Sequence, residues 1–150
     1  MTLNFDKYAQ EGNRYINDLA KELGYPEDRD RTARVLRTVL NAVRDMLPDS
    51  ENLQLASQLP MFLKAVYLEG YTLRKRVEKP RQLKEFTDRV KSNSGRTSSH
   101  DFKSEEEVEK GIQTVLSSLR QYISQGEMED IIAHMPKGIK QFISPIVLDK

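Results

Sequence analysis

Two stretches of the sequence show an apolar helical pattern that is interrupted by a proline directly after a bulky apolar residue. They are ASQLPMFLKAVY, residues 56–67, and IAHMPKGIKQFI, residues 132–143. Proline lacks an amide hydrogen and disfavours the helical conformation in the residue before it, yet it fits well in the first turn of a helix. Each step therefore predicts a fixed corner, where a short helix ends and another begins at Pro60 or Pro136. Because the preceding residue is apolar in both cases, we expect both corners to be buried.

The apolar residues around these corners repeat after 76 positions, without a gap from Arg34/Lys110 to Tyr67/Ile143. The matched apolar pairs are Leu36/Ile112, Val39/Val115, Leu40/Leu116, Val43/Leu119, Leu47/Ile123, Leu55/Ile131, Leu59/Met135, Leu63/Ile139 and Val66/Phe142. The alternative explanation is chance, because the apolar period repeats in any amphipathic helical bundle. The apolar stripe, the turn and the proline all recur at the same offset of 76 positions, and this favours a duplication of the helical unit.

We therefore predict an all-α fold, a helical bundle made of two tandem, pseudo-symmetric four-helix halves that share one core. The halves cover residues of about 4–70 and 83–145, and a basic connector of about 71–82 joins them in a single domain 1–150. Each half would contain two long helices followed by two short ones. Ser50 is the expected N-cap of the third helix. The segments Ser92–Phe102 and Ser124–Glu127 are expected to be a loop and a turn.

Composition excludes several classes of protein. Cysteine is absent, which excludes disulfides, thiolate catalysis and zinc sites of the cysteine type. Charged residues make up 31% of the chain, but the net charge is only +1, so there is no global bias towards nucleic acid or anionic membranes. The sequence begins without a basic region followed by an apolar stretch, and no apolar run approaches the ~18–20 residues of a membrane span. We expect a cytoplasmic protein without membrane contact.

The segment from Arg37 to Tyr71 resembles the bacterial domain-of-unknown-function family 2267. The resemblance depends on Ala-x-Gln-Leu-Pro at 56–60, an acidic turn at 49–51, and an apolar run that ends in Tyr-x-Glu-Gly-Tyr at 67–71. It extends over nearly the whole chain and includes the segment 123–139. The resemblance implies the helical architecture and a bacterial origin, and it implies no reaction.

The helix expected at residues 61–67 is apolar on almost every side. It is either a central core helix or the source of a surface patch, in which Met61, Phe62 and Ala65 would bind a partner protein or a second copy of the chain.

The connector carries a run of basic residues that could contact phosphates, although a charge run is usually just solvated. Its candidate polyanion-binding residues are Arg74, Lys75, Arg76, Lys79 and Arg81. His100 is expected to be exposed. Asp130 and His134 lie four residues apart, as a metal pair could, but an ion pair on the helix surface is the simpler interpretation. We therefore expect no metal site, no cofactor and no catalytic residues.

The leading hypothesis is a non-catalytic cytoplasmic interaction or scaffold module, with self-association through the helix at 61–67. The alternative is nucleic-acid or polyanion binding by the basic connector. An enzyme is the weakest hypothesis, because no convergent set of polar residues is visible in the sequence.

Overall fold

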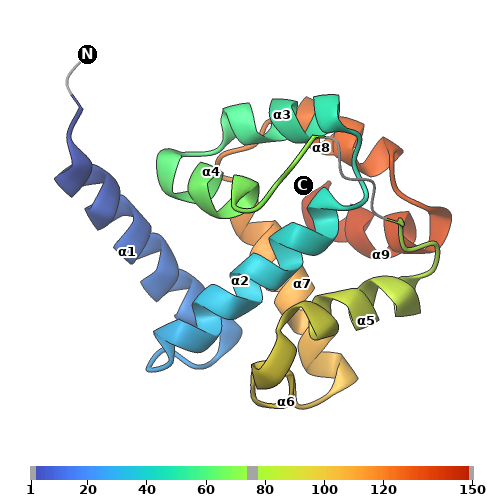
Figure 1. Cartoon of the computed structure of the whole chain (residues 1–150), viewed down its shortest axis with the longest axis horizontal. Helices are drawn as coiled ribbons and strands as arrows, with labels where there is room; N and C mark the ends of the chain where they lie inside the picture. The colour runs from blue at the N-terminus through green and yellow to red at the C-terminus, as the bar shows by residue number, and fades with distance from the viewer. Residues whose placement is uncertain (1–2, 74–77, 149–150) are drawn as a thin grey trace.

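The computed structural model describes residues 3–73 and 78–148, and within these ranges it contains nine α-helices, one 3-10 helix and no strand (Figure 1). The first four helices are α1 (Phe5–Leu23), α2 (Arg29–Arg44), α3 (Asp49–Gln58) and α4 (Met61–Leu68). After the connector come α5 (Leu83–Asn93), the 3-10 helix η1 (Gly95–Thr97), α6 (Ser98–Asp101), α7 (Glu105–Leu119), α8 (Gln125–Ala133) and α9 (Lys137–Val147). The predicted all-α class is confirmed. No helix among the described residues combines the length and apolarity needed to cross a membrane.

Side-chain caps fix where several helices begin. A side-chain oxygen accepts an N–H of the first helical turn at the N-caps Asn4, Asp28, Ser104 and Ser124. Gly24 ends α1 with φ of 98°, a left-handed conformation that a residue without Cβ adopts at little cost. The prediction for Ser50 is wrong: α3 begins after Pro48, which has no side-chain cap.

Both proline corners are present, and the apolar residue before each proline is buried. Pro60 has φ −66° and ψ 162°, and Pro136 has φ −60° and ψ 153°, so each is an extended N-cap residue directly before α4 or α9. The residues before them, Leu59 and Met135, are buried. Each corner turns a short helix back over the longer helices of the core.

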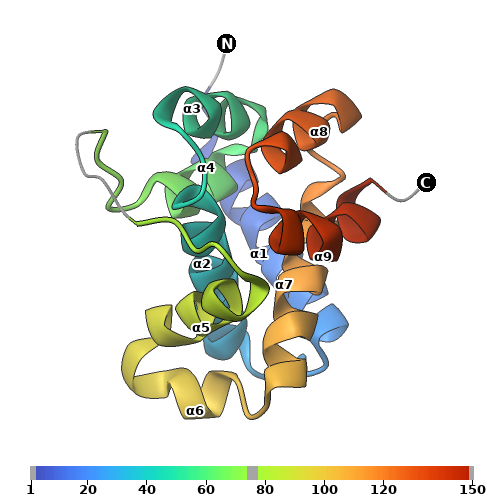
Figure 2. The ribbon, with the colours of Figure 1, turned by 90° about the vertical axis from the view of Figure 1, so that its right-hand side faces the viewer.

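Helices α2 and α7 pack against each other at the centre of the molecule (Figure 2). Helices α1 and α5 each contact both of them, while α4 packs on α1 and α2, and α9 on α5 and α7. Helices α3 and α8 lie side by side at one end, and each also contacts the short helix that follows it. The buried apolar residues form one continuous core.

Two segments predicted to be irregular are helical. The Ser92–Phe102 segment contains the end of α5 together with η1 and α6, and its last two residues are buried. The predicted turn at Ser124–Glu127 is the first turn of α8. In both places serine and glycine favoured a loop prediction, but tertiary contacts and capping hydrogen bonds stabilise a helix.

The shared core leads to a stability prediction. Leu63 in α4 and Ile139 in α9 are both 0% exposed. We expect Leu63→Ala and Ile139→Ala each to lower the free energy of unfolding by about 2–5 kcal/mol, because each removes buried methyl groups and leaves a cavity. Urea unfolding followed by circular dichroism should show one transition for both variants. Two separate transitions would show that the parts before and after the connector unfold independently, against a shared core.

Candidate functional site

Helix α4 divides the candidate partner-binding residues between the core and the surface. Leu63 and Tyr67 are buried, whereas Met61 is 49% exposed and Ala65 is also exposed. Phe62 is half-buried, with its ring 5.5 Å from that of Tyr15. Phe62 therefore contributes mainly to packing between helices, and Met61 and Ala65 contribute to the surface.

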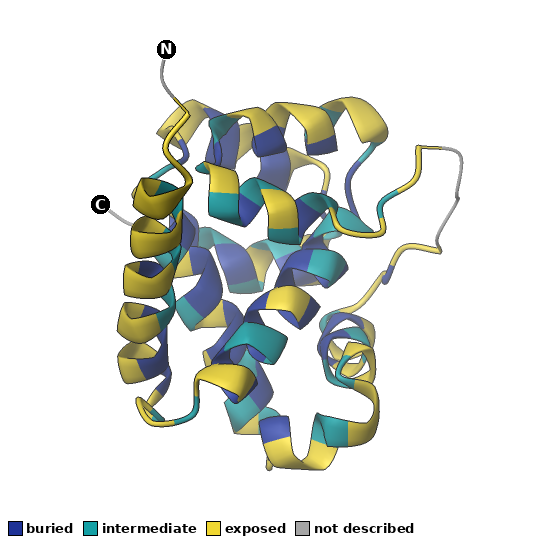
Figure 3. Ribbon diagram, turned by 60° about the vertical axis from the view of Figure 1, so that its left-hand side comes forward, coloured by how far each residue is buried: buried dark blue, intermediate teal, exposed yellow. Residues whose placement is uncertain are grey.

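The N-terminal turns of α1 add apolar surface beside α4. Phe5 is 70% exposed, and its ring makes an edge-to-face contact with Tyr8, at 6.1 Å between centroids. The spacing of Phe5, Tyr8, Tyr15, Leu19 and Leu23 in the sequence predicts one apolar stripe along α1. Phe5 at its start is nevertheless exposed, and the outer side of this helix is exposed along most of its length (Figure 3). A shallow apolar groove of about 260 Å³ lies between the two helices, lined in part by Tyr8, Ala9, Gly12, Ile16, Phe62 and Val66. We call Phe5, Tyr8, Met61, Ala65 and Val66 the α1–α4 face.

A second groove, of about 690 Å³, runs between α1 and α7. Inside it, the Tyr15 hydroxyl and Ser118 Oγ share a hydrogen bond of 2.5 Å, and burial raises the pKa of Tyr15 to about 12. The acidic and basic residues that line the groove are all exposed: Glu11, Arg14, Asp18, Lys21 and Glu22. Their charges are solvated, and the Tyr15 hydroxyl, whose ionisation burial disfavours, is paired with Ser118.

The basic connector is described only in part. Arg74, Lys75 and Arg76 lie outside the described residues, and Lys79 and Arg81 are exposed. Lys84, at the end of the same run, has its ammonium 2.8 Å from Asp88 and 3.6 Å from Glu105, so acidic residues already balance its charge.

Arg44 anchors the backbone at the start of the connector. Its Nη1 donates hydrogen bonds to the carbonyl oxygens of Tyr67 and Glu69, at 2.9 and 2.8 Å. Its guanidinium also lies 5.3 Å from the centre of the Tyr71 ring. These bonds hold the end of α4 against the end of α2, so the role of Arg44 is structural.

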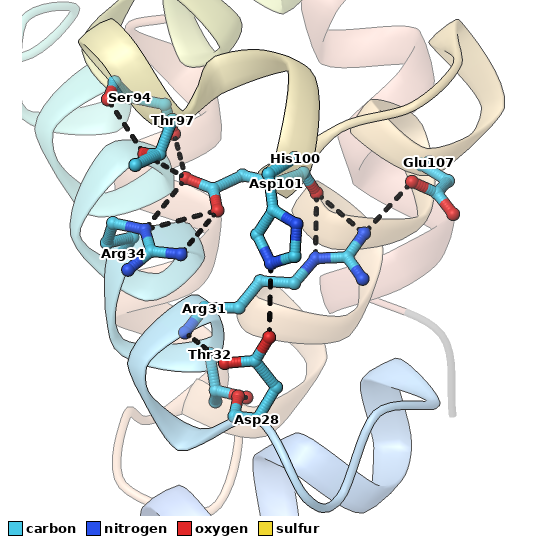
Figure 4. A network of polar contacts seen from close by, with 9 residues as sticks. All are labelled: Asp28, Arg31, Thr32, Arg34, Ser94, Thr97, His100, Asp101 and Glu107. Atoms are coloured by element: carbon cyan, nitrogen blue, oxygen red, sulfur yellow. Dashed lines mark hydrogen bonds and ion pairs between the residues drawn. The ribbon is translucent and has the colours of Figure 1, made fainter.

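The most extensive polar network joins α2, α6 and α7 (Figure 4). The carboxylate of Asp101 is fully buried and accepts hydrogen bonds from Arg34 at 2.9–3.1 Å, Ser94 at 2.9 Å and Thr97 at 2.7 Å. Arg31 donates to the Asp101 carbonyl oxygen and pairs with Glu107 at 3.0 Å. With its polar atoms satisfied by the protein itself, this network stabilises the fold and leaves no open ligand position.

Two effects act on the ionisation of Asp101. Burial alone would raise its pKa, but the hydrogen bonds from Arg34, Thr97 and Ser94, together with the charge of Arg34, hold the pKa below its ordinary value. Nearby, His100 is half exposed, and its Nε2 lies 3.2 Å from Asp28, a contact that the sequence did not indicate.

A cluster of carboxylates lies where α3 meets α8. Oxygens of Glu51, Glu127 and Asp130 all lie within 4.8 Å of one another. Glu127 is 4% exposed, whereas Asp130 is exposed. Burial, the carboxyl–carboxylate contact with Glu51, and the negative charges of Glu51 and Asp130 together raise the pKa of Glu127 to about 7.

The Asp130/His134 pair considered from the sequence has a different arrangement in the structure. His134 Nε2 lies 3.7 Å from Glu51, on the neighbouring helix, and no contact to Asp130 is among the described ion pairs. The sequence could not reveal this cluster, because its members come from two helices that are 76 residues apart at Glu51 and Glu127.

A protein-family model for an uncharacterised conserved protein, DUF2267, matches residues 12–142. The chain belongs to the DUF2267 family. The match includes both proline corners and the carboxylate cluster, while the first turns of α1 precede it. No curated protein matches this DUF2267 chain.

The buried network of the DUF2267 chain generates a pH prediction. We expect Asp101→Asn to lower the free energy of unfolding by about 2–3 kcal/mol at pH 7, because it leaves Arg34 without its buried partner. The pKa of Asp101 is lowered in the folded state, so its stabilisation is present above about pH 4 and is lost as the pH falls below that value. Denaturant unfolding at several pH values measures the difference.

Asp88→Asn is the matched control, because Asp88 forms an exposed pair with Lys84. It should change stability by no more than about 0.5 kcal/mol. An Asp101→Asn effect that is equally small, or that persists unchanged below pH 3, would contradict the role given to this carboxylate.

Proposed function

We propose that this protein is a non-catalytic interaction module that self-associates through the α1–α4 face. The observation that carries the proposal is the exposure of large apolar side chains on two adjacent helices. Phe5 on α1 is 70% exposed and Met61 on α4 is 49% exposed. Such side chains contribute most when they enter an apolar pocket on a partner.

A second copy of the chain is the partner that we favour. An apolar projection, Phe5, lies next to an apolar groove between α1 and α4, because Tyr8 both contacts Phe5 and lines that groove. A twofold axis would bring Phe5 of each copy to the groove of the other, so one surface would supply both parts of the contact. Gly12 lies in the groove wall, where the absence of a side chain lets Phe62 of α4 pack closely on α1, since a Cβ there would lie 3.2 Å from Phe62 Cβ.

We also propose that the chain consists of two similar halves, at about 4–70 and 83–145, each built on four helices, with η1 and α6 as an addition to the second half. Contacts between residues 76 positions apart support this arrangement, since an internal twofold axis brings equivalent residues together. Arg31 pairs with Glu107, and a Cβ added at Gly111 would lie 3.3 Å from Val35 Cγ1. The two halves would differ most in their first parts, because α1 has 19 residues, whereas α5 has 11 and is followed by η1 and α6.

Polyanion binding by the connector is the weaker proposal. Lys79 and Arg81 are the exposed candidates among the described residues, and Lys84 is already paired with acidic groups. A cytoplasmic location and a bacterial origin accompany the main proposal, and they follow from the composition and the family pattern respectively.

Self-association is tested by size-exclusion chromatography with light scattering over a range of protein concentrations. We expect the molar mass to approach twice the 17.4 kDa of one chain as the concentration rises. Phe5→Lys and Ala65→Glu should each weaken association at least about tenfold, because each places a charge in a desolvated apolar contact. Phe62→Lys is a poorer test, since Phe62 packs against Tyr15 inside the fold.

Leu53→Lys is the matched control, because Leu53 is a 49% exposed apolar residue on α3, outside the α1–α4 face. It should leave the association unchanged. A wild-type chain that stays monomeric at high concentration would rule out this interface. So would a dimer that Leu53→Lys weakens as much as Phe5→Lys and Ala65→Glu do.

A further inference from the structure

We propose that the carboxylates of Glu51, Glu127 and Asp130 form a binding site for one divalent cation of the oxygen-preferring class, such as Mn²⁺, Ca²⁺ or Mg²⁺. The site lies between the first turn of α3 and the first two turns of α8. Oxygens from all three side chains lie within 4.8 Å of one another, a spacing at which a cation with metal–oxygen distances of ~2.1–2.5 Å can contact all of them.

Two carboxylate oxygens inside this cluster lack a hydrogen-bond partner, which indicates a site for a positively charged ligand. Oε1 of Glu127 and Oε1 of Glu51 are both buried and have no hydrogen-bond partner. Glu127 as a whole is 4% exposed. Buried carboxylate oxygens are almost always hydrogen-bonded, paired with a basic group or bound to a metal. No lysine or arginine in the described part of the chain forms an ion pair with Glu51, Glu127 or Asp130.

Helix dipoles account for only part of the arrangement. Glu51 and Glu127 lie in the first turns of their helices, where the partial positive charge favours an acidic residue. Asp130 lies beyond the first turn of α8 and gains little from the dipole. The dipoles also do not explain why all three side chains converge. An acidic side chain can interact with the N-terminus of its own helix while it points towards solvent.

The donor set indicates the class of cation. Three carboxylates are hard ligands that suit Mg²⁺, Ca²⁺ and Mn²⁺. His134 lies at the edge of the cluster, with Nε2 3.7 Å from Glu51, and an imidazole ligand would favour Mn²⁺ among these three ions. Asp130 is exposed, so the cluster is open to solvent on its side and a cation can enter from there.

The test uses the full, untagged chain after treatment with a chelator and exchange into metal-free buffer at pH 7.5. Titration with Mn²⁺, followed by the electron paramagnetic resonance signal of free Mn²⁺, should show saturable binding of one ion per chain. Competition with Ca²⁺ and Mg²⁺ then ranks the three ions. At a concentration about 100-fold above the dissociation constant, the bound ion should raise the Tm by several degrees.

Glu127→Gln is the decisive variant, because it keeps the shape of the side chain and removes one ligand charge. It should weaken Mn²⁺ binding at least about tenfold and abolish the Tm rise. Without added metal it should be at least as stable as the wild type, since it removes one of three clustered negative charges. That comparison separates loss of the site from loss of the fold.

Glu129→Gln is the matched control, because Glu129 lies on the same helix and is exposed. It should bind Mn²⁺ as the wild type does. The proposal would be wrong if the wild type bound no ion saturably, or if Glu127→Gln and Glu129→Gln retained the same affinity. In that case the Glu51–Glu127 contact would be a carboxyl–carboxylate pair that shares a proton.

Discussion

The fold depends on the mutual burial of the apolar stripes on α2 and α7. Val35 and Val39 on one helix, and Ile112 and Val115 on the other, are all 0% exposed. Completely burying an aliphatic side chain of this kind contributes about 1.5–3 kcal/mol, and this gain must offset the conformational entropy of a chain in which 31% of the residues are charged. Helix α2 packs on α5 and α7, and α7 packs on α1 and α2, so the segments before and after the connector cover each other.

This central packing determines where the other features lie. With α2 and α7 in contact, the short helices that follow them are brought to one end of the molecule, where α3 and α8 meet. The corners at Pro60 and Pro136 then turn α4 and α9 back over the core. The carboxylate cluster and the α1–α4 face both result from these turns, but they involve different contacts. A cation at the cluster would join α3 to α8, whereas self-association would use α1 and α4.

Much of the helical framework could be predicted from the sequence, because the apolar period, the capping residues and the two prolines act locally. The same local pattern placed Phe5 in the core, since periodicity shows which side of α1 is apolar but not how far the rest of the protein extends along it. The composition of the serine-rich segment Ser92–Phe102 predicts a loop, and local composition cannot show that Arg34 on α2, far away in the sequence, pairs with Asp101. The cluster of Glu51 and Glu127 was missed for the same reason. Of the candidate surface, Met61 and Ala65 are exposed as the patch requires, and Phe62 is mainly a packing residue.

The two-half arrangement proposed above would also explain why a cation site arises at this position. Near an internal twofold axis, equivalent residues contact each other, so identical charged residues in the two halves bring like charges together. At Arg31 and Glu107 the equivalent positions carry opposite charges and form an ion pair at 3.0 Å. At Glu51 and Glu127 both positions carry glutamate, and Asp130 adds a third carboxylate. Three carboxylates within 4.8 Å of one another repel when all are charged, and this repulsion can be relieved in two ways, by holding a proton or by binding a cation. A divalent cation neutralises more of this charge than one proton does, and it also supplies the missing partner for both orphaned oxygens.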